Sequence, residues 1–354
     1  MVRTEYYKDL TKMNTFGMKV KARCFMEYDS VADLVDIEFE ELARPVLHIG
    51  GGSNLLFTDD FKGTVLHSKI DFIEILDEED SDVLVSVGAG VVFDDFCEWA
   101  AKEGLWGVEN LSYIPGEVGA SAVQNIGAYG VEVKDVIHTV YCYDTVEEEF
   151  VNFSVEECEY GYRDSIFKDP EIRGRYIVTH VVFELSREPK PRLDYGHLKA
   201  AVESHASQSL TPALIRKAII KIRKEKLPEP SVMGSAGSFF KNPVISQEHF
   251  ARIEAAAKAE HGPDYTVPHY VIPSEAEGRV EESLIKIPAA WLIEQCGWKG
   301  RRSGNAAVWD KQPLVIVNYT GEAFPEEIIG LERRIIASVK SKFDIELHPE
   351  VDHI

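Results

Sequence analysis

Residues 114–130 read IPGEVGASAVQNIGAYG, and this segment is the strongest guide to the fold. Four glycines (116, 119, 127 and 130) fall within fifteen residues, and small side chains separate them. An ordinary turn needs one or two glycines, whereas a longer run of small residues lets a backbone pack closely against a flat ligand or its phosphates. Taken alone, such a segment is more often a structural turn.

A second glycine segment, GGGSN, occupies residues 50–54. It follows an expected strand at 45–49 but is not a dinucleotide fingerprint, because Leu55 stands where the third glycine belongs and no helix is expected there. Consecutive glycines let main-chain N–H groups approach a pyrophosphate, and Ser53 and Asn54 add side-chain hydrogen bonds. The two glycine segments together favour a nucleotide cofactor.

The rest of the chain predicts an α+β protein. A helix with an apolar stripe from Phe93 to Ala101 is expected to end near Gly104, and another is expected to start with Thr211 as its N-cap. Prolines at 228 and 230 indicate a domain boundary, and 354 residues predict two or three domains. Further elements are expected as strands at 64–67, 83–87, 139–143, 177–184 and 314–318, and as helices at 249–261, 289–295 and 326–343.

Composition excludes several classes of protein. Apolar residues make up 45% of the chain, which is typical of a globular protein, and the formal net charge is −22. Such a charge disfavours binding to nucleic acid or to an anionic membrane surface. No run of 18 apolar residues and no secretory leader is found, so we expect a soluble cytoplasmic protein. Five widely spaced cysteines without a C-x-x-C pair fit buried thiols in a reducing compartment, and no histidine pattern predicts a metal.

The charge is unevenly distributed. Residues 71–110 contain twelve acidic side chains and one basic one, Lys102, whereas residues 215–245 contain seven basic and two acidic side chains, a net charge of +5. A basic segment of this kind is as often a solvated helix face as an anion-binding site. Any anion-binding site is nevertheless expected to use the basic segment.

Three single residues carry possible chemistry. Ser238 follows Met233–Gly237, where a nucleophile elbow is ruled out because Met233 occupies a position that needs glycine. A buried Ser238 hydroxyl could instead donate a proton to a ligand. Arg163, beside Tyr162, suits a bidentate grip on a carboxylate, although a structural ion pair is the usual role of such an arginine. Glu350 lies in a short extended segment near the C-terminus, where an ordinary surface or capping role is expected.

These residues and segments resemble one family, the bacterial UDP-N-acetylenolpyruvoylglucosamine reductases, over nearly the whole chain. The matching stretches, in the family's order, are 14–17, 50–54, 114–130, 160–168, 237–243, 290–295 and 349–351. Gly51 stands where a glutamate is commoner in the family. The resemblance implies a two-lobed FAD-binding module of the vanillyl-alcohol-oxidase (PCMH) type and a C-terminal α+β substrate-binding domain. The implied boundaries are 1–68 for the first lobe, joined by about 343–354, then 69–227 for the second lobe and 228–342 for the substrate domain.

The resemblance also implies the reaction. NADPH reduces FAD at N5, and hydride then passes to the vinyl carbon of UDP-N-acetylglucosamine enolpyruvate, giving UDP-N-acetylmuramate for peptidoglycan and hence for the cell wall, cell shape and cell division. Arg163 would hold the substrate carboxylate as a fixed cation, and Glu350 would do so as a protonated donor, because two bare carboxylates repel. Ser238 would protonate the enolate.

Further contacts follow from the same resemblance. Tyr195 matches the tyrosine loop of the family's longer branch, which implies that it closes over the nucleotide diphosphate. The implied substrate contacts are Tyr129, Tyr162, Tyr195, Lys226, Asn242, Lys286 and Gln295. The implied FAD contacts are Gly50, Gly51, Gly52, Ser53, Asn54, Pro115, Gly116, Gly119, Ala120, Ser121, Gln124, Gly127 and Arg223.

Two alternatives stay open at this level, namely another FAD-dependent oxidoreductase with the same flavin fold and a catalytically silent nucleotide-binding protein. The segment around Ser238 and the terminal Glu350 argue against the first, because the wider flavin fold does not require them. The presence of Arg163, Ser238 and Glu350 together argues against the second. We expect a monomer without nucleic-acid partners or membrane insertion.

Overall fold

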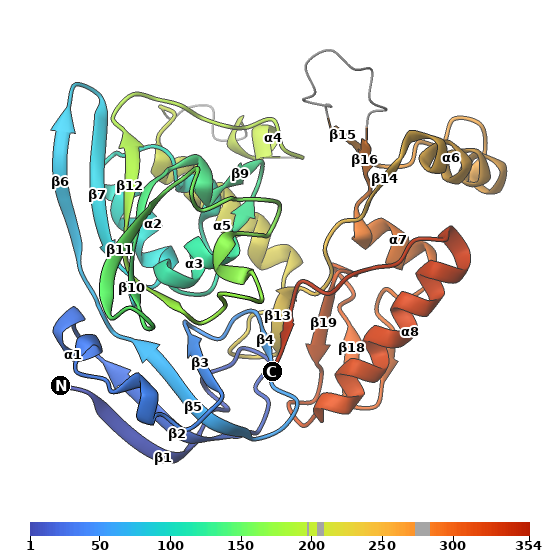
Figure 1. Cartoon of the computed structure of the whole chain (residues 1–354). Helices are drawn as coiled ribbons and strands as arrows, with labels where there is room; N and C mark the ends of the chain where they lie inside the picture. The colour runs from blue at the N-terminus through green and yellow to red at the C-terminus, as the bar shows by residue number, and fades with distance from the viewer. Residues whose placement is uncertain (197, 204–208, 273–283) are drawn as a thin grey trace. The chain divides into compact units, whose positions relative to one another are not determined.

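The computed structural model describes residues 1–196, 198–203, 209–272 and 284–354 (Figure 1). The chain forms two compact units. The first unit comprises residues 1–14, 19–53 and 59–225, and the second comprises residues 15–18, 54–58 and 226–354.

The first unit contains a four-stranded sheet in the order β1-β2-β5-β3. Strand β1 (Arg3–Asp9) runs antiparallel to β2 (Lys21–Tyr28), whereas β5 (Phe61–Ser68) runs parallel to both β2 and β3 (Val46–Ile49). The short helix α1 (Val31–Val35) is capped by Ser30, whose side chain accepts a hydrogen bond from the backbone N–H of Asp33 at 3.1 Å. The strands expected at 45–49 and 64–67 are confirmed.

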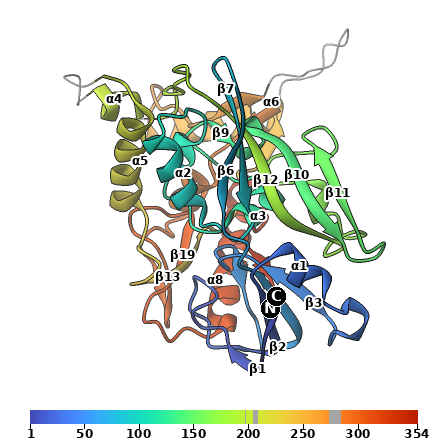
Figure 2. The same ribbon diagram turned by 90° about the vertical axis from the view of Figure 1, so that its left-hand side faces the viewer.

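A five-stranded antiparallel sheet completes the first unit, in the order β11-β10-β12-β7-β6. Its strands are β11 (Glu149–Ser154), β10 (Ile137–Asp144), β12 (Tyr176–Ser186), β7 (Asp82–Gly88) and β6 (Ile73–Glu79). Helix α2 (Phe93–Lys102) packs on this sheet through Phe93 and Phe96, which are fully buried (Figure 2). It ends before Gly104, whose φ of +72° requires glycine, so the expected helix and its stop are confirmed.

The glycine segment at 114–130 differs from the extended loop that its composition predicts, because residues Val118–Gln124 form helix α3. The residues between the glycines are small enough for a helix to form, and Val118, Ser121 and Ala122 bury one of its faces. Gly119 lies where the helix meets the sheet, and a Cβ there would come within 2.9 Å of the Ala89 Cβ.

Helix α5 (Pro212–Lys226) carries most of the basic segment and packs with α4 (Leu198–Glu203) around Trp106. The Thr211 hydroxyl accepts a hydrogen bond from the backbone N–H of Leu214 at 3.2 Å, as its expected N-cap role requires. The first unit's minor elements are β8 (Gly127–Ala128), β9 (Val131–Glu132) and the 3-10 turns Phe39–Glu41, Glu109–Leu111, Val133–Asp135 and Ile166–Lys168.

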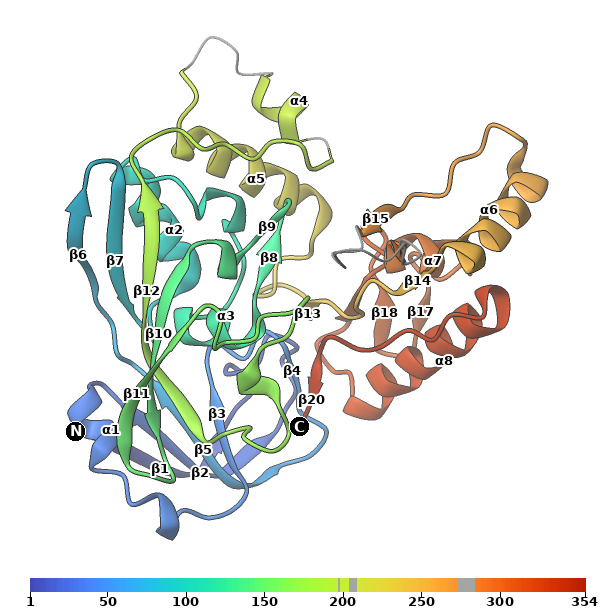
Figure 3. The same cartoon turned by 45° about the horizontal axis from the view of Figure 1, so that its top comes forward.

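The second unit has a four-stranded antiparallel sheet, β13-β19-β18-β17, next to the long helix α8 (Pro325–Phe343) (Figure 3). Its strands are β13 (Gly234–Ser238), β19 (Val315–Asn318), β18 (Ala306–Val308) and β17 (Arg302–Ser303). A smaller sheet and two helices comprise β14 (Val244–Ser246), β16 (Leu284–Lys286), β15 (Tyr270–Ile272), α6 (Gln247–His261) and α7 (Ala289–Gln295). Strand β20 (Asp352–His353) pairs in parallel with β4 (Leu55–Leu56).

All five cysteines are free thiols, and four of them are buried, with Cys296 half-buried. The expected absence of a disulfide framework is therefore confirmed. Within the part of the chain that the structure describes, no helix is both long and apolar enough to cross a bilayer.

Candidate functional site

The two glycine segments meet in the first unit. The Ser53 hydroxyl donates a hydrogen bond to the backbone carbonyl of Pro115 at 3.0 Å. A Cβ on Gly51 would lie 3.2 Å from the Gly116 Cα, so the two backbones pack closely at this point. Gly52 has a φ of +61°, and a Cβ there would collide with the Met13 carbonyl at 2.0 Å. The segments therefore present one continuous surface of backbone with few side chains.

The remaining residues of the second glycine segment have structural partners. The Ser121 hydroxyl is buried and donates to the Val118 carbonyl at 2.7 Å. The Gln124 side-chain oxygen accepts a hydrogen bond from Lys168 Nζ at 3.1 Å. Ala120 packs under Gly50, where an added Cβ would lie 3.0 Å from the Ala120 Cβ. Helix α3 therefore supports the flavin-binding surface that the sequence predicts.

Arg163 is held against the end of the same glycine segment. Its Nη2 donates to the Gly127 carbonyl at 2.6 Å and its Nη1 to the Asn125 carbonyl at 3.2 Å. The guanidinium also lies over the Tyr162 ring, 5.3 Å from its centroid, and Nη1 is 3.8 Å from Glu132 Oε1. Arg163 has a φ of +56°, an unusual backbone conformation for a residue with a side chain. These contacts fix the position of the cation.

A cluster of tyrosines surrounds Arg223 on α5. Its Nε donates to the Tyr113 carbonyl at 3.0 Å, and it interacts with the Tyr129 hydroxyl. Burial lowers the pKa of Arg223, whereas nearby Tyr129 opposes that shift. The ring of Tyr195 meets that of Tyr129 edge-on, with centroids 6.1 Å apart. The structure therefore brings Tyr129, Tyr195 and Arg223 together in one unit.

The basic segment divides into two kinds of side chain. Arg216 and Arg223 turn into the first unit, where Arg216 forms an ion pair with Asp94. Lys217 and Lys221 are exposed. The basic segment thus has an exposed lysine face, while Arg216 pairs with Asp94 and Arg223 reaches Tyr113 of the tyrosine cluster. Its use by an anion remains a prediction.

Asn110 supports the tyrosine cluster, although no sequence pattern points to it. Its side-chain amide donates to the carbonyl of Tyr129 at 2.9 Å and to that of Arg192 at 2.8 Å, three residues before Tyr195. Asn110 is only 1% exposed. Its partners lie 19 and 82 residues away in the chain, so no local pattern signals its role.

Ser238 and Glu350 lie on two paired segments of the second unit. The Lys241 N–H donates to the His348 carbonyl at 2.9 Å, and the Glu350 N–H donates to the Phe239 carbonyl at 2.8 Å. This antiparallel pairing places Glu350 opposite Phe239, the residue that follows Ser238. Ser238 is exposed, not buried as its aromatic neighbours suggested, because the buried rings of Phe239 and Phe240 fill the core instead.

The first glycine segment leads directly into this region. Asn54 Nδ2 donates to the Glu350 carbonyl at 2.9 Å, and the Asp352 N–H donates to the Asn54 carbonyl at 2.9 Å. The pairing of β4 with β20 follows immediately. The chain's C-terminal segment is thus fixed to the end of the GGGSN motif.

Three further predicted substrate residues belong to the second unit. Asn242 accepts the backbone N–H of Ala289 through Oδ1 at 2.9 Å, which joins the Ser238 segment to the start of α7. Lys286 lies on β16, opposite Val244 of β14. Lys226 is exposed, and its carbonyl accepts the indole N–H of Trp309 at 2.9 Å.

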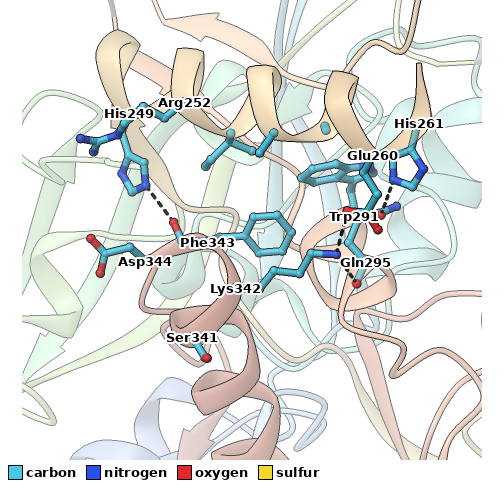
Figure 4. A pocket seen from close by; sticks show the side chains of 13 residues that line it. His249, Arg252, Glu260, His261, Trp291, Gln295, Ser341, Lys342, Phe343 and Asp344 are labelled. Atoms are coloured by element: carbon cyan, nitrogen blue, oxygen red, sulfur yellow. Dashed lines mark hydrogen bonds and ion pairs between the residues drawn. The ribbon is translucent and has the colours of Figure 1, made fainter. Parts of the chain in front are cut away.

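Gln295 lines a separate pocket of about 340 Å³ whose walls come from α6, α7 and α8 (Figure 4). Its side-chain oxygen lies 3.3 Å from His261 Nε2, and its backbone carbonyl accepts from Lys342 Nζ at 3.1 Å. Among the described residues that line this pocket, Ser238 and Glu350 are not found. The structure therefore does not bring Gln295 together with these two residues.

The chain is similar to known proteins over nearly its whole length. Residues 229–354 match the family described as UDP-N-acetylenolpyruvoylglucosamine reductase, C-terminal domain, and residues 23–151 match an FAD binding domain. A UDP-N-acetylenolpyruvoylglucosamine reductase of Bacteroides fragilis is 49% identical over 98% of both chains. One of Chromobacterium violaceum is 45% identical over 97% of this chain and 96% of its own.

A solved structure supports the fold. The crystal structure of UDP-N-acetylenolpyruvylglucosamine reductase from Thermus caldophilus superposes with a TM-score of 0.65 at 23% identity, covering 100% of this chain and 98% of that one. The expected α+β fold, a flavin-binding module followed by a C-terminal domain, is confirmed by this likeness and the two family matches.

Proposed function

The chain belongs to the UDP-N-acetylenolpyruvoylglucosamine reductase family, and from this we propose that it reduces UDP-N-acetylglucosamine enolpyruvate to UDP-N-acetylmuramate at the expense of NADPH. It is an FAD-dependent oxidoreductase of peptidoglycan synthesis. The observation that carries the detailed proposal is the backbone pairing of the Ser238 segment with the Glu350 segment, in which Glu350 lies opposite the residue that follows Ser238.

The surface formed by residues 50–54 and 115–127 fits a dinucleotide. Its Gly51 and Gly116 backbones pack closely, with 3.2 Å between a Cβ on Gly51 and the Gly116 Cα, and glycine main-chain N–H groups suit contact with a diphosphate. Arg223 and Ser53 provide polar side chains beside it. FAD, when bound, supplies the hydride chemistry, by accepting two electrons from NADPH and passing them to the substrate.

Ser238 is the proposed proton donor. Addition of hydride to the terminal vinyl carbon leaves the electron pair on the carbon that bears the carboxylate, as an enolate. The Ser238 O–H bond then breaks, its proton joins that carbon, and solvent restores the hydroxyl. Gly237, with a φ of +68°, and the buried Phe239 hold the serine on a fixed turn. A positioned proton donor of this kind contributes about 10²–10⁴-fold.

Arg163 and Glu350 are the proposed partners of the substrate carboxylate. Two carbonyl acceptors and a tyrosine ring hold Arg163 in place, so its charge needs little reorganisation when the enolate forms. Glu350 is half-buried, and its backbone is anchored on both sides, by Phe239 and by Asn54. We assign it a protonated carboxyl that donates to the developing negative charge.

The UDP-sugar is proposed to contact Tyr129, Tyr162, Tyr195, Lys226, Asn242, Lys286 and Gln295. The edge-on contact between Tyr129 and Tyr195 supports a shared role for these two side chains. Within the three-part organisation expected above, residues 1–68 and 69–227 would bind FAD and residues 228–342 the substrate.

We also propose that the protein works as a cytoplasmic monomer without nucleic-acid partners. The five free cysteines fit a reducing compartment. The net charge of −22 disfavours binding to a polyanion.

The experiment that tests the proposed function incubates the FAD-loaded protein with NADPH and UDP-N-acetylglucosamine enolpyruvate and identifies the product by mass spectrometry. We expect a product with two more hydrogen atoms than the substrate, formed in step with NADPH oxidation. NADPH oxidation that continues without consuming the enolpyruvyl substrate would instead indicate a different oxidoreductase.

A further inference from the structure

His67 bridges two carboxylates in the interior of the first unit. It lies on β5 and is 2% exposed. Its Nδ1 is 2.9 Å from Glu27 Oε1 on the neighbouring strand β2, and its Nε2 is 2.9 Å from Glu117 Oε1, directly before helix α3. We call these three residues the His67 bridge. It connects the four-stranded sheet to the second glycine segment.

The bridge requires a protonated ring if both carboxyl groups are ionised. A neutral imidazole carries one N–H group and therefore donates to only one carboxylate, whereas an imidazolium donates to both. Burial by itself lowers the pKa of His67, but the hydrogen bonds that the ring donates to Glu117 and Glu27 outweigh burial and raise the pKa above its ordinary value. A carboxylate oxygen 2.9 Å from each ring nitrogen thus favours the imidazolium form.

The other charged and titratable groups around the ring do not supply an alternative proton. Lys69 opposes the charge on His67 weakly, and Arg3 lies 3.8 Å from the second oxygen of Glu27. Burial lowers the pKa of His48 to about 3, so His48 is neutral and pairs with the Tyr28 hydroxyl at 2.7 Å. Burial also raises the pKa of Tyr28, which keeps that hydroxyl protonated.

The far side of Glu117 reaches the first glycine segment. Glu117 is 7% exposed, and within the described part of the chain its Oε2 has no hydrogen-bond partner. This oxygen would lie 3.3 Å from a Cβ on Gly50, so the Gly50 backbone rests directly on the Glu117 carboxyl. The Glu117 side chain therefore links the second glycine segment to the first, and its hydrogen bond with His67 fixes its position.

We propose that His67 is a positioning residue for FAD: by holding Glu117 against Glu27 as an imidazolium, it fixes the 115–121 segment against the 50–54 segment. This inference rests on the proposed function, because it takes these segments as the flavin surface. Loss of the ring proton would leave the buried carboxylate of Glu117 and the half-buried carboxylate of Glu27 facing a neutral ring. The glycine segments would then separate, and FAD would bind less tightly.

The pH dependence follows from the direction of the shift. A histidine whose pKa is raised in the folded state stabilises that state fully at pH values below its ordinary pKa of about 6.5. This stabilisation is lost as the pH rises through the pKa that the histidine has in the folded state. The dissociation constant of FAD is therefore expected to stay level in mild acid and to increase in alkali. We assign this pH-dependent step in the FAD dissociation constant to His67 and expect it to be absent when His67 is replaced.

The test compares FAD binding to the wild-type apoprotein, His67→Gln and Glu117→Gln, measured by flavin fluorescence across pH. Each variant keeps a side chain of similar size but removes one charge of the bridge. We expect each to weaken FAD binding about tenfold or more at neutral pH. The double variant is expected to bind no more weakly than either single variant, because the bridge is already broken.

His138→Gln is the matched control, because His138 is an exposed histidine of the same unit. It should bind FAD as the wild type does and keep the pH step. Nitrogen-15 spectra of the His67 ring give a readout that does not depend on FAD, with both ring nitrogens expected to carry protons at neutral pH. Glu117→Gln provides the binding test if His67→Gln does not fold.

Two results would overturn the inference alone. The first is a His67 ring with a single N–H at neutral pH. The second is FAD binding by folded His67→Gln or Glu117→Gln within about twofold of the wild type. A wild-type protein that binds no FAD would overturn the proposed function and, with it, the role of His67.

Discussion

The side-chain amide of Asn54 donates a hydrogen bond to the backbone carbonyl of Glu350, with 2.9 Å between nitrogen and oxygen. The two residues are 296 positions apart in the chain. Asn54 ends the first glycine segment, and Glu350 is the proposed carboxyl donor near the C-terminus. This hydrogen bond joins the proposed flavin-binding segment to a residue proposed to contact the substrate.

Removal of this hydrogen bond should loosen the C-terminal segment. In Asn54→Ala, we expect about 0.5–1.5 kcal/mol of lost stability, the usual contribution of one hydrogen bond. Amide hydrogen exchange should accelerate at residues 350–354, which are paired with residues 54–58. Asn152→Ala, at an exposed position on β11, is the control and should leave this exchange unchanged. Unchanged exchange in Asn54→Ala would show that the β4–β20 pairing alone holds the segment.

Ser238→Ala should separate the two half-reactions. Flavin reduction by NADPH is expected to stay close to the wild-type rate, because no proton from Ser238 is needed there. Reoxidation by the enolpyruvyl substrate should slow by about 10²–10⁴-fold. Stopped-flow absorbance of the flavin measures both steps, with Ser231→Ala, an exposed serine of the same unit, as the control. Equal loss in both half-reactions would mean that Ser238 shapes the site without donating a proton.

Asn110→Leu should disturb the tyrosine cluster. The substitution leaves the Tyr129 and Arg192 carbonyls without their buried donor, at a cost of about 1–3 kcal/mol for each group left unpaired. Denaturant unfolding measures that loss. If Tyr129 and Tyr195 bind the UDP-sugar, KM for this substrate should increase while KM for NADPH changes little. A loss of stability with both KM values unchanged would restrict Asn110 to a structural role.

The ion pair between His353 and Glu332 should make stability depend on pH. Glu332 raises the pKa of His353, so the pair stabilises the fold fully below the ordinary histidine pKa and loses this effect as the pH rises through the folded-state value. His353→Gln should reduce the difference in unfolding free energy between about pH 6 and about pH 9. His348→Gln, at an exposed position, is the control and should retain the wild-type difference.

Local patterns in the sequence predicted individual elements well. Helices α2 and α7 and strands β7 and β10 lie where apolar spacing and stop signals placed them. The glycine content at 114–130 concealed helix α3, because small residues suit both a loop and a closely packed helix. Ser238 was expected to be buried from its aromatic neighbours, but those rings turn inward and leave it exposed.

Residues that act through distant partners could not be found in this way. His67 and Glu117 are 50 positions apart, and Asn110 meets Arg192 across 82 positions. A histidine within an apolar strand was the only local sign of the His67 bridge. The family resemblance pointed to residues at the family's site positions. The residues that support them could be identified only from the three-dimensional structure.

The most direct test of the central claim mixes the purified yellow protein with NADPH without oxygen and then adds UDP-N-acetylglucosamine enolpyruvate. We expect NADPH to bleach the flavin absorbance and the enolpyruvyl substrate to restore it as UDP-N-acetylmuramate forms. A flavin that NADPH bleaches but that stays colourless after this substrate is added would contradict the assigned reaction.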